Sequence, residues 1–379
     1  MIEFTLTNEQ KALQELARNF AQKEIVPIAI KYDQEPFDPA EILQKAHKAG
    51  VMNMTTPKQY GGHGLGLLDA SLMTEELNAG CAGIGGMISI NSLACGPILI
   101  GGSDEQKKRF ISPLCESGKT ASFALTEREA GSDAAGVKTK AVRKGDAYVL
   151  NGQKCFITNA GFAALYTIFA TTDPAKGTKG ITAFVVPRET PGLSIGKVED
   201  KMGQRALNVA EVNLDDVIVP AANVLGAEGQ GFKIAMETLN EGRVNIATTA
   251  LGIARAALEA SIAYAKERVQ FGQRIGNFQS INFLLADMAA AVDASRLLTW
   301  YAASRCDQGL PFAREAAQAK LFASDTAMWV ATNAVQIHGG YGYIKGYPVE
   351  KLMRDAKLTQ IYEGTNQVNR IVAGGALMR

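Results

Sequence analysis

The sequence has few of the residues that build metal sites and disulfide frameworks. Its 379 residues include only three histidines and five cysteines. The histidines are scattered, at His47, His63 and His338, and no two cysteines have the spacing of a zinc site or a CxxC motif. An odd number of cysteines also argues against a disulfide framework. We therefore expect no metal site, and we expect the cysteines to be small buried hydrophobic residues.

Excess charge and long apolar runs are also lacking. The chain has 39 Lys and Arg against 38 Asp and Glu, a net charge of +1, which provides no basic field for nucleic acid. No uninterrupted apolar run reaches the roughly 18 residues of a membrane span. Residues 1–5 do not resemble a signal or transit peptide. These features predict a reduced, cytoplasmic protein, long enough for two or three domains.

The first third of the chain has the pattern of helices. Thr7 and Gln10 form a capping box before apolar residues at helical spacing, and Pro27 is expected to end or bend that helix. Asp38 is expected to start a second helix, which Gly50 would stop.

Short β-forming runs dominate from residue 121 to about residue 224. Turn residues separate runs at 147–150, 155–158, 165–171, 181–186, 193–198 and 209–219. Asn151 and Gly152, between the first two runs, predict a hairpin turn. This pattern predicts a small all-β domain, either a sandwich or a barrel.

From Gly231 to the end the chain is helical in pattern and rich in alanine. Ile281, Leu285, Met288 and Val292 recur at the spacing of one buried helix face. Long helices with few turns predict a bundle of four or more helices. The predicted fold class is therefore α+β, mainly α, with domains at residues 1–120, 121–228 and 229–379.

The most informative segment lies near the C-terminus, at residues 360–367. It places Glu363 between Tyr362 and a Gly364–Thr365 pair. Gly364 allows a sharp turn that could aim Glu363 into a cavity. A carboxylate held against apolar walls has a raised pKa and can act as a base for carbon acids. The ordinary alternative is a solvated loop glutamate.

Two segments of the β region could bind a flat or anionic ligand. Residues 125–133, LTEREAGSD, offer hydroxyls and backbone N–H groups to an anion or to the polar edge of a flavin, although a capped loop uses the same residues. Residues 156–161, FITNAG, offer an aromatic face beside a hydroxyl for stacking on a planar ring. The alternative is an ordinary strand with Phe156 in the core.

Two segments of the helical region could also contact a ligand. Residues 267–272, ERVQFG, place Arg268 where it could meet a pyrophosphate, or where it simply favours a helix C-terminus. Residues 336–342, QIHGGYG, would let the backbone approach a ligand closely, although tight turns use the same residues. We expect His338 within it to be structural.

In order and spacing, these five segments resemble those of the acyl-CoA dehydrogenases. The family's first signature, LTEPxAGSD, is similar to residues 125–133, and its second signature is similar to residues 336–355. The IYEGT segment at residues 361–365 matches the one that carries the family's base. The resemblance covers essentially the whole chain.

The resemblance implies a helical N-terminal domain, a middle β domain and a C-terminal four-helix domain, with FAD bound between the last two. The residues implied to line the flavin are Phe123, Leu125, Thr126, Phe156 and Thr158. The residues implied to hold a neighbouring subunit's cofactor are Arg268, Gln270, Phe271, Gln336 and Gly340, with Thr365 and Gln367 at its adenine half. Ser132 would serve both the cofactor and the CoA arm of the substrate. Such a site implies a homotetramer.

The resemblance also implies the chemistry. Glu363 would remove the Cα proton of an acyl-CoA thioester while the flavin accepts a hydride from Cβ, and the electrons would pass to an electron-transferring flavoprotein. The backbone N–H of Glu363 would meet the charge that develops on the thioester oxygen. The substrate side would include Asn240, Arg243, Tyr362 and Gly364, with Arg243 ordering the loop of the base.

The chain departs from the family pattern at four positions. Arg128 replaces a usual proline, Phe156 stands where many members have tryptophan, and Asn240 stands where an aspartate often contacts the pantetheine arm. Gly242 occupies the position at which some branches place their base, so that alternative base is lacking here. Glu241 is about 100° away around the helix and is expected to be solvated.

The acyl group and the direction of the reaction stay open. Small residues in segment 80–96, where the family packs the acyl tail, could leave room for a chain or permit close helix packing. Similarity over the whole chain, which lies between the butyryl-CoA and medium-chain types, favours a short- to medium-chain straight acyl-CoA. An enoyl-CoA reductase on the same fold is the alternative enzyme, and an acyl-CoA oxidase is less expected because that branch is longer. A flavin-bearing DNA-binding relative would need a basic C-terminal extension, and a structural bundle without flavin is the remaining alternative.

Overall fold

The structure is a computed structural model that describes residues 5–35 and 38–378. Residues 1–4, on which part of the expectation about a targeting peptide rests, lie outside the described residues. Helices form the first third of the described chain: α1 Asn8–Phe20, α2 Val26–Ala29, α3 Lys31–Gln34, α4 Ala40–Lys48, α5 Leu67–Gly80, α6 Ala82–Ser89, α7 Asn91–Gly101, α8 Asp104–Phe110 and α9 Ser112–Ser117.

Most helix signals in this region act as the sequence predicts, but Pro27 does not end the first helix, because α1 already ends at Phe20. Thr7 and Gln10 exchange two hydrogen bonds of 3.1 Å and so form the capping box of α1. A π-helical turn follows α1, and Pro27 lies in the first turn of α2. The Asp38 carboxylate accepts a hydrogen bond from the N–H of Ala40, the first residue of α4. The φ of Gly50, +73°, ends that helical path.

The middle of the chain forms one sheet. Its strands are β1 Ala121–Ala124, β2 Lys140–Lys144, β3 Ala147–Thr158, β4 Leu165–Thr171, β5 Ile181–Pro187, β6 Leu193–Val198, β7 Val209–Pro220 and β8 Val224–Leu225. The strand order is β6-β7-β3-β2-β4-β5-β8, with β1 parallel to β4. Strand β4 is buried along its whole length, because core residues cover both of its faces.

The predicted hairpin turn at Asn151 and Gly152 is wrong. Strand β3 runs straight through both residues, and its pairing with β7 shifts register at this point. Asn151 exchanges two hydrogen bonds of 2.9 Å with Asp216 of β7. The local signal therefore marks a bulge, because a long partner strand pairs with both halves of β3. The actual turn between β2 and β3 contains Gly145, whose φ is +63°.

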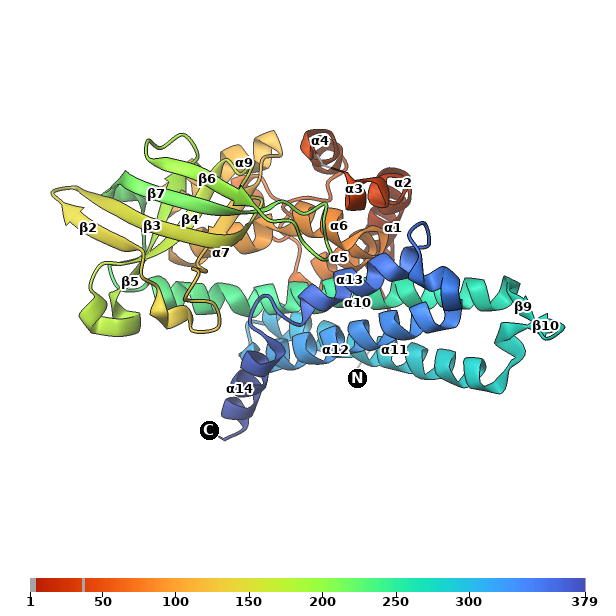
Figure 1. The fold of residues 1–379 in the computed structure, drawn as a ribbon. Coiled ribbons are helices and arrows are strands. Elements are labelled where there is room, and N and C mark those ends of the chain that lie inside the picture. Colours follow the sequence, from red (N-terminus) through yellow and green to blue (C-terminus); the bar gives the residue numbers. More distant parts are fainter. Residues whose placement is uncertain (1–4, 36–37, 379) are drawn as a thin grey trace.

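The last third forms the predicted bundle. Its helices are α10 Gly231–Glu267, α11 Gln279–Asp307, α12 Ala313–His338, α13 Pro348–Thr359 and α14 Asn366–Leu377. Their core is rich in alanine, which lets neighbouring helices pack closely. On α11, Met288 and Val292 are buried, and Ile281 and Leu285 pack partly buried against the same core. Figure 1 shows α10 running beneath both the sheet and the N-terminal helices, which confirms the mainly α, α+β architecture.

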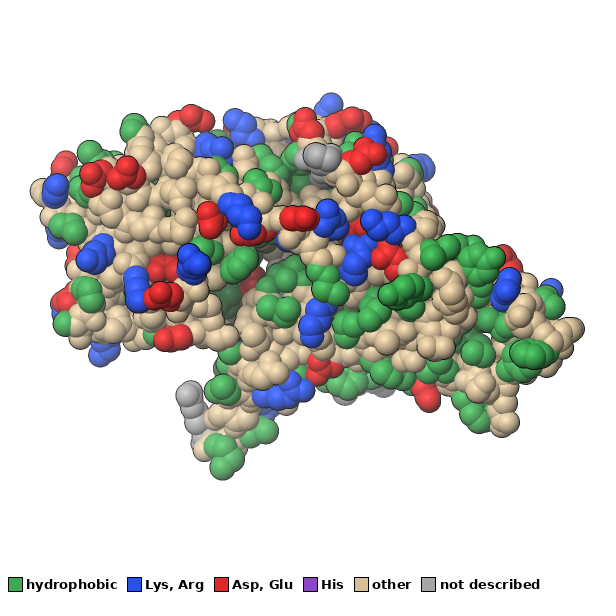
Figure 2. Space-filling view, in the orientation of Figure 1, with side chains coloured by type: hydrophobic (Ala, Val, Ile, Leu, Met, Phe, Trp, Pro, Cys, Tyr) green, Lys and Arg blue, Asp and Glu red, His purple; other side chains and the backbone are tan. Residues whose placement is uncertain are grey.

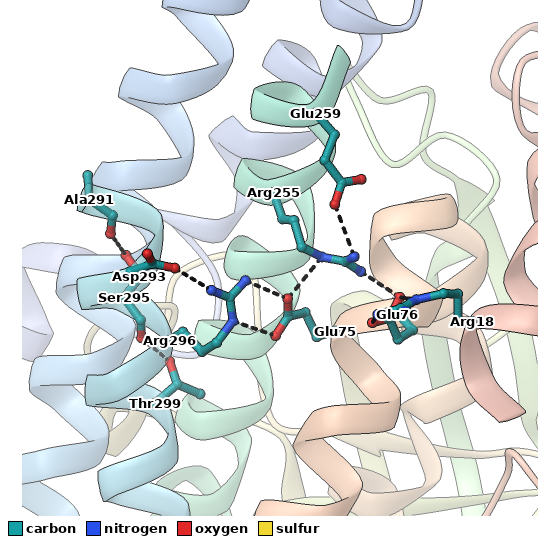
Figure 3. Close-up of polar contacts among 10 residues, drawn as sticks. All are labelled: Arg18, Glu75, Glu76, Arg255, Glu259, Ala291, Asp293, Ser295, Arg296 and Thr299. Atoms are coloured by element: carbon teal, nitrogen blue, oxygen red, sulfur yellow. Dashed lines mark hydrogen bonds and ion pairs between the residues drawn. The ribbon is translucent and has the colours of Figure 1, made fainter. Parts of the chain in front are cut away.

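A network of buried charges joins the N-terminal helices to the bundle (Figure 3). Glu75 and Glu76 of α5 are buried. Arg255 of α10 lies 2.9 Å from the Glu75 carboxylate and 2.7 Å from that of Glu76. Arg296 of α11 lies 3.0 Å from the Glu75 carboxylate, and Arg18 of α1 lies 2.8 Å from the Glu76 carboxylate. Each carboxylate has two arginine partners on different helices, so the network ties α1, α5, α10 and α11 together.

Two helical stretches, Ala82–Gly101 and Gly231–Glu267, are long and apolar enough by composition to cross a membrane. Buried residues make up 61% and 67% of their most apolar windows, as in the core helices of a folded protein. Across residues 5–35 and 38–378, no group of three or more His, Cys, Asp and Glu side chains could hold a metal ion.

Candidate functional site

Glu363 lies in the short connection between α13 and α14, and its backbone is strained. The φ of Glu363 is +56° and that of Gly364 is +85°. A left-handed conformation costs an L-residue roughly 1–2 kcal/mol. It persists only where the surroundings hold it in place. The connection is therefore a fixed turn, and glycine suits its second position.

Hydrogen bonds from Lys320 of α12 and from residues of α14 hold this turn. The carbonyl of Gly364 accepts from Lys320 Nζ at 2.7 Å and from Asn369 Nδ2 at 2.8 Å. Lys320 also donates to Asn366 Oδ1 at 2.9 Å. The Thr365 hydroxyl accepts from a backbone N–H in the first turn of α14 and caps that helix. Sequence reasoning missed Lys320 because its partners lie 44 and 46 residues away.

The carboxylate of Glu363 points into the protein. Its Oε2 atom is buried and has no hydrogen-bond partner among the described residues. Burial raises the pKa of Glu363 to about 7, and the nearby charges of Arg243 and Lys320 oppose that rise. A base with this pKa is half ionised near neutral pH, so it can both take and release a proton there.

Helix α10 forms the wall opposite this carboxylate. A Cβ atom at Gly242 would lie 2.5 Å from Glu363 Oε2, so the carboxylate fills the space that a side chain would need. Arg243, the next residue, is buried and leaves its Nε without a partner in the described part of the chain, while its Nη1 donates to Asn240 Oδ1 at 2.8 Å. Three of the expected site residues, Glu363, Arg243 and Asn240, therefore lie close together. Tyr362, adjacent to the base, is half-buried.

The expectation that Glu241 is solvated is wrong. Its side chain is half-buried, and burial raises its pKa, with a further contribution from the charge of Asp307. Asp307, whose charge acts on Glu241, is the last residue of α11, and the helical spacing of α10 alone could not show this proximity.

The β-domain residues of the predicted site present an unusual aromatic surface. Phe156 is 64% exposed, with φ +58°, at a register shift between Lys154 and Ile157. The alternative that Phe156 is an ordinary core residue is therefore wrong. Thr158, two residues on, is half-buried. The bulge turns the phenyl ring outward.

A buried ion pair that sequence reasoning missed holds the neighbouring 125–133 loop. Glu127 accepts from Lys154 Nζ at 2.7 Å and from the N–H groups of Lys138 and Thr139 at 2.7 and 3.0 Å. Lys154 also donates to the carbonyl of Leu125 at 3.0 Å. The only local signal was a lysine among the apolar residues of a strand.

The remaining residues of this loop differ in exposure. Phe123 is half-buried, and its ring packs 5.0 Å from that of Phe169. Leu125 is buried and Thr126 half-buried, whereas Ser132 is exposed at the tip. The loop offers a hydroxyl and backbone groups, and it is joined to the strand that carries Phe156. The carbonyl of Thr126 accepts a hydrogen bond of 2.9 Å from the N–H of Cys155, the residue before Phe156.

A second group of predicted residues gathers at the other end of the bundle. Arg268, Gln270 and Gly340 line a cavity of about 420 Å³, in which the Arg268 guanidinium lies 5.5 Å from the centre of the Tyr341 ring. Phe271, beside this cavity in sequence, is 94% exposed. This cavity lies near the short β9–β10 hairpin (Val269–Gln270 and Gln273–Arg274), far along the bundle from the α13–α14 connection (Figure 1).

Other residues of this end have simpler roles. Gln336 is exposed in the last turn of α12. His338 is buried, stacks on Tyr264 at 4.2 Å and contacts the carbonyl of Ala334 through Nδ1 at 2.8 Å. Burial lowers the pKa of His338, as suits a neutral structural histidine. A single chain therefore does not bring Arg268 and Glu363 into one site, and Gln367, exposed on α14, belongs to the Glu363 end.

Comparison with protein families accounts for almost the whole chain. Models of the acyl-CoA dehydrogenase N-terminal, middle and C-terminal domains match residues 7–118, 122–217 and 229–378. Among solved structures, butyryl-CoA dehydrogenase from Megasphaera elsdenii superposes with a TM-score of 0.97 at 47% identity over 100% of both chains. A chain from a study of the electron transferring flavoprotein of Acidaminococcus fermentans gives a TM-score of 0.98, also at 47% identity over both complete chains.

Curated relatives cover both directions of the expected chemistry. A short-chain-specific acyl-CoA dehydrogenase from Clostridium acetobutylicum is 45% identical over 379 residues, 100% of both chains. An acryloyl-CoA reductase (NADH) from Anaerotignum propionicum is 45% identical over 380 residues, 100% of this chain and 96% of the relative. The motifs, the three domain matches and these full-length similarities show that the chain belongs to the acyl-CoA dehydrogenase family.

Proposed function

We propose that this protein is an FAD-dependent dehydrogenase that converts a short- to medium-chain acyl-CoA to the trans-2-enoyl-CoA. The observation that carries the proposal is the Glu363 carboxylate, whose Oε2 is buried and unpaired opposite Gly242. A carboxylate with a pKa near 7 suits proton removal from a weak carbon acid. The short-chain-specific relative supports the same acyl class.

The residues of the chain account for the proton transfer. When Glu363 takes the Cα proton it becomes neutral, which removes the cost of keeping a buried charge. Arg243 and Lys320 keep enough of the carboxylate ionised to begin the reaction, because both favour its charged form. The backbone N–H of Glu363 makes no backbone hydrogen bond within the described chain. It is therefore free to donate to a thioester oxygen as negative charge develops there.

The exposed aromatic and hydroxyl groups fit a flavin. Phe156 has an exposed ring and a left-handed backbone conformation, and the half-buried Thr158 offers a hydroxyl two residues further on. FAD bound there would accept the hydride from the substrate Cβ. We propose that its ring system contacts Phe123, Leu125, Thr126, Phe156 and Thr158, and that Ser132 lies between it and the CoA arm.

The separation of the two groups of site residues supports a homotetramer. The Arg268 cavity is far from Glu363 in one chain, so we propose that it holds the cofactor of a neighbouring subunit, with Gln270, Phe271, Gln336 and Gly340. Apolar side chains gather on the visible face of the bundle in Figure 2. A further cavity of about 620 Å³ includes the partly exposed Phe322 and Trp329. Exposed apolar surface of this kind is typical of subunit contacts.

The electron partner and the direction of the reaction belong to this proposal. The relationship to a chain studied with an electron transferring flavoprotein supports such a partner. The acryloyl-CoA reductase relative favours one second candidate, an enoyl-CoA reductase, in which Glu363 would deliver the proton that it otherwise removes. We further propose the domain limits 1–120, 121–228 and 229–379 and a cytoplasmic location.

The test is the absorption spectrum of the purified protein, followed by anaerobic mixing with butyryl-CoA and octanoyl-CoA. We expect a flavin spectrum that bleaches with at least one of them. Reduced protein that is reoxidised faster by the matching enoyl-CoA would favour the reductase direction. A protein that binds no FAD would contradict the proposal, and an FAD-loaded monomer at low concentration would contradict the shared site.

A further inference from the structure

Lys320 is a buried cation that the predicted site did not include. It lies on α12, its side chain is 0% exposed, and its Nζ donates to Gly364 O at 2.7 Å and to Asn366 Oδ1 at 2.9 Å. Lysine is almost never fully buried unless it is paired. Both acceptors lie within three residues of Glu363. The ammonium thus reaches from the bundle core to the turn that carries the base.

The charges around Glu363 come from two helices. Arg243 approaches from α10 and Lys320 from α12, and both favour the carboxylate form. The charge of Asp325, also on α12, acts on Lys320, as does that of Glu363, and Tyr362 lies next to the base. Burial lowers the pKa of Lys320 to about 7, so its positive charge depends on these partners. Arg243 keeps its charge at all ordinary pH values, whereas Lys320 can lose it.

We propose that Lys320 is a positioning residue for the base: its buried ammonium holds the left-handed turn that aims Glu363 and keeps the carboxylate ionised. The inference rests on the proposed function, since it assigns Glu363 as the base. Two hydrogen bonds from one ammonium fix the carbonyl after Glu363 and the side chain three residues after it. The same charge offsets part of the cost of burying the carboxylate.

Two substitutions separate charge from shape. Lys320→Met keeps the length of the side chain and removes the cation, so the carboxylate of Glu363 should ionise less readily. Lys320→Arg keeps a cation that does not titrate, so the carboxylate should ionise more readily. Ser324→Ala is the matched control, because Ser324 lies one turn along α12 and also donates to Asn366 Oδ1, at 3.1 Å, without carrying a charge.

The measurement is the rate of anaerobic flavin bleaching by butyryl-CoA across about pH 5.5–9, with FAD content and substrate affinity determined for each variant. The pH midpoint of Lys320→Met should rise by about one unit, which makes bleaching about tenfold slower well below the midpoint and nearly normal well above it. The midpoint of Lys320→Arg should fall, and that of Ser324→Ala should stay in place. A purely structural role would instead lower the rate equally at every pH.

A second readout does not need turnover. The carboxylic acid infrared band of Glu363, with Glu363→Gln as the blank, should titrate with the same shifts in midpoint. Three outcomes would overturn the proposal. They are an unchanged pH midpoint in Lys320→Met, a shift in the midpoint of Ser324→Ala equal to that of Lys320→Met, and a rise in the midpoint of Lys320→Arg. If Lys320→Met does not assemble, the Arg and Ser324→Ala midpoints decide. If wild-type protein is not bleached by any acyl-CoA, the proposed function fails, while the infrared titration still tests the coupling between Lys320 and Glu363.

Discussion

Replacing Glu363 by glutamine should abolish most activity and, at alkaline pH, stabilise the protein. The amide keeps the shape of the side chain and cannot accept the Cα proton. General-base catalysis is commonly worth about 10²–10⁴-fold, and Gly242 on the opposite wall offers no substitute. Anaerobic bleaching by butyryl-CoA should therefore slow by at least about 10²-fold, while FAD content and acyl-CoA binding stay normal.

The effect on stability follows from the pKa of Glu363. Burial raises it from 4.5 to about 7, so the folded state binds the proton more tightly than the unfolded chain does. The resulting stabilisation is complete below the unfolded pKa and is lost as the pH rises through about 7. The lost part is at most about 3.4 kcal/mol, from 1.36 kcal/mol for each of the 2.5 pKa units between 4.5 and about 7. A glutamine does not titrate, so the variant should have a higher Tm than wild type at about pH 8, and the difference should shrink towards pH 5.

Glu241→Gln is the matched control, because this half-buried carboxylate lies on α10 beside Gly242. It should leave the bleaching rate within a few-fold of wild type. Rapid bleaching by Glu363→Gln combined with a large loss in Glu241→Gln would show that Glu241 is the base. If the Tm of Glu363→Gln shows the same pH dependence as wild type, the pKa of Glu363 is not raised in the folded protein.

Three other substitutions test separate parts of the molecule. Glu363→Gly combined with Gly242→Glu should restore part of the rate that Glu363→Gly loses in the bleaching assay; glycine is needed at 363, because a glutamine would keep filling the space 2.5 Å from a Cβ at 242. Arg268→Ala should weaken FAD retention by about 1.5–3 kcal/mol in a dialysis assay. Arg274→Ala is the control and should retain FAD normally, because Arg274 is exposed in the β9–β10 hairpin that follows Arg268. Equal FAD content in both variants would contradict the phosphate contact of Arg268. Arg255→Met should destabilise the fold by about 1.5–3 kcal/mol in urea unfolding, because Glu75 and Glu76 each lose one of two arginine partners, and an unchanged midpoint would refute that role.

Local sequence patterns predicted most of the architecture. The capping box of α1 and the strand runs at 165–171 and 181–186 depend on neighbouring residues, and the structure contains them where the sequence indicates. The Asn151–Gly152 pair shows where this reasoning fails. The same dipeptide suits a turn or a bulge, and only the pairing of β3 with the whole of β7 decides between them.

The positions of charged residues could not be derived in this way. Lys154 and Lys320 are fully buried cations whose carboxylate and carbonyl partners lie 27 and 44 residues away. From sequence alone, a lysine in a strand or helix is predicted to lie on the solvent-exposed face. The resemblance located Glu363, but the groups that set its charge and conformation come from two helices, and only the fold shows that they meet there.

The space between positions 242 and 363 explains why the location of the base is an exclusive choice. A Cβ at 242 would lie 2.5 Å from Glu363 Oε2, which is shorter than any ordinary contact, so a side chain there must displace the carboxylate. Two acidic side chains in this space would also repel each other and raise each other's pKa. The residue at 242 therefore constrains the residue at 363 through volume and charge, and Gly242 is the counterpart that lets Glu363 occupy the site.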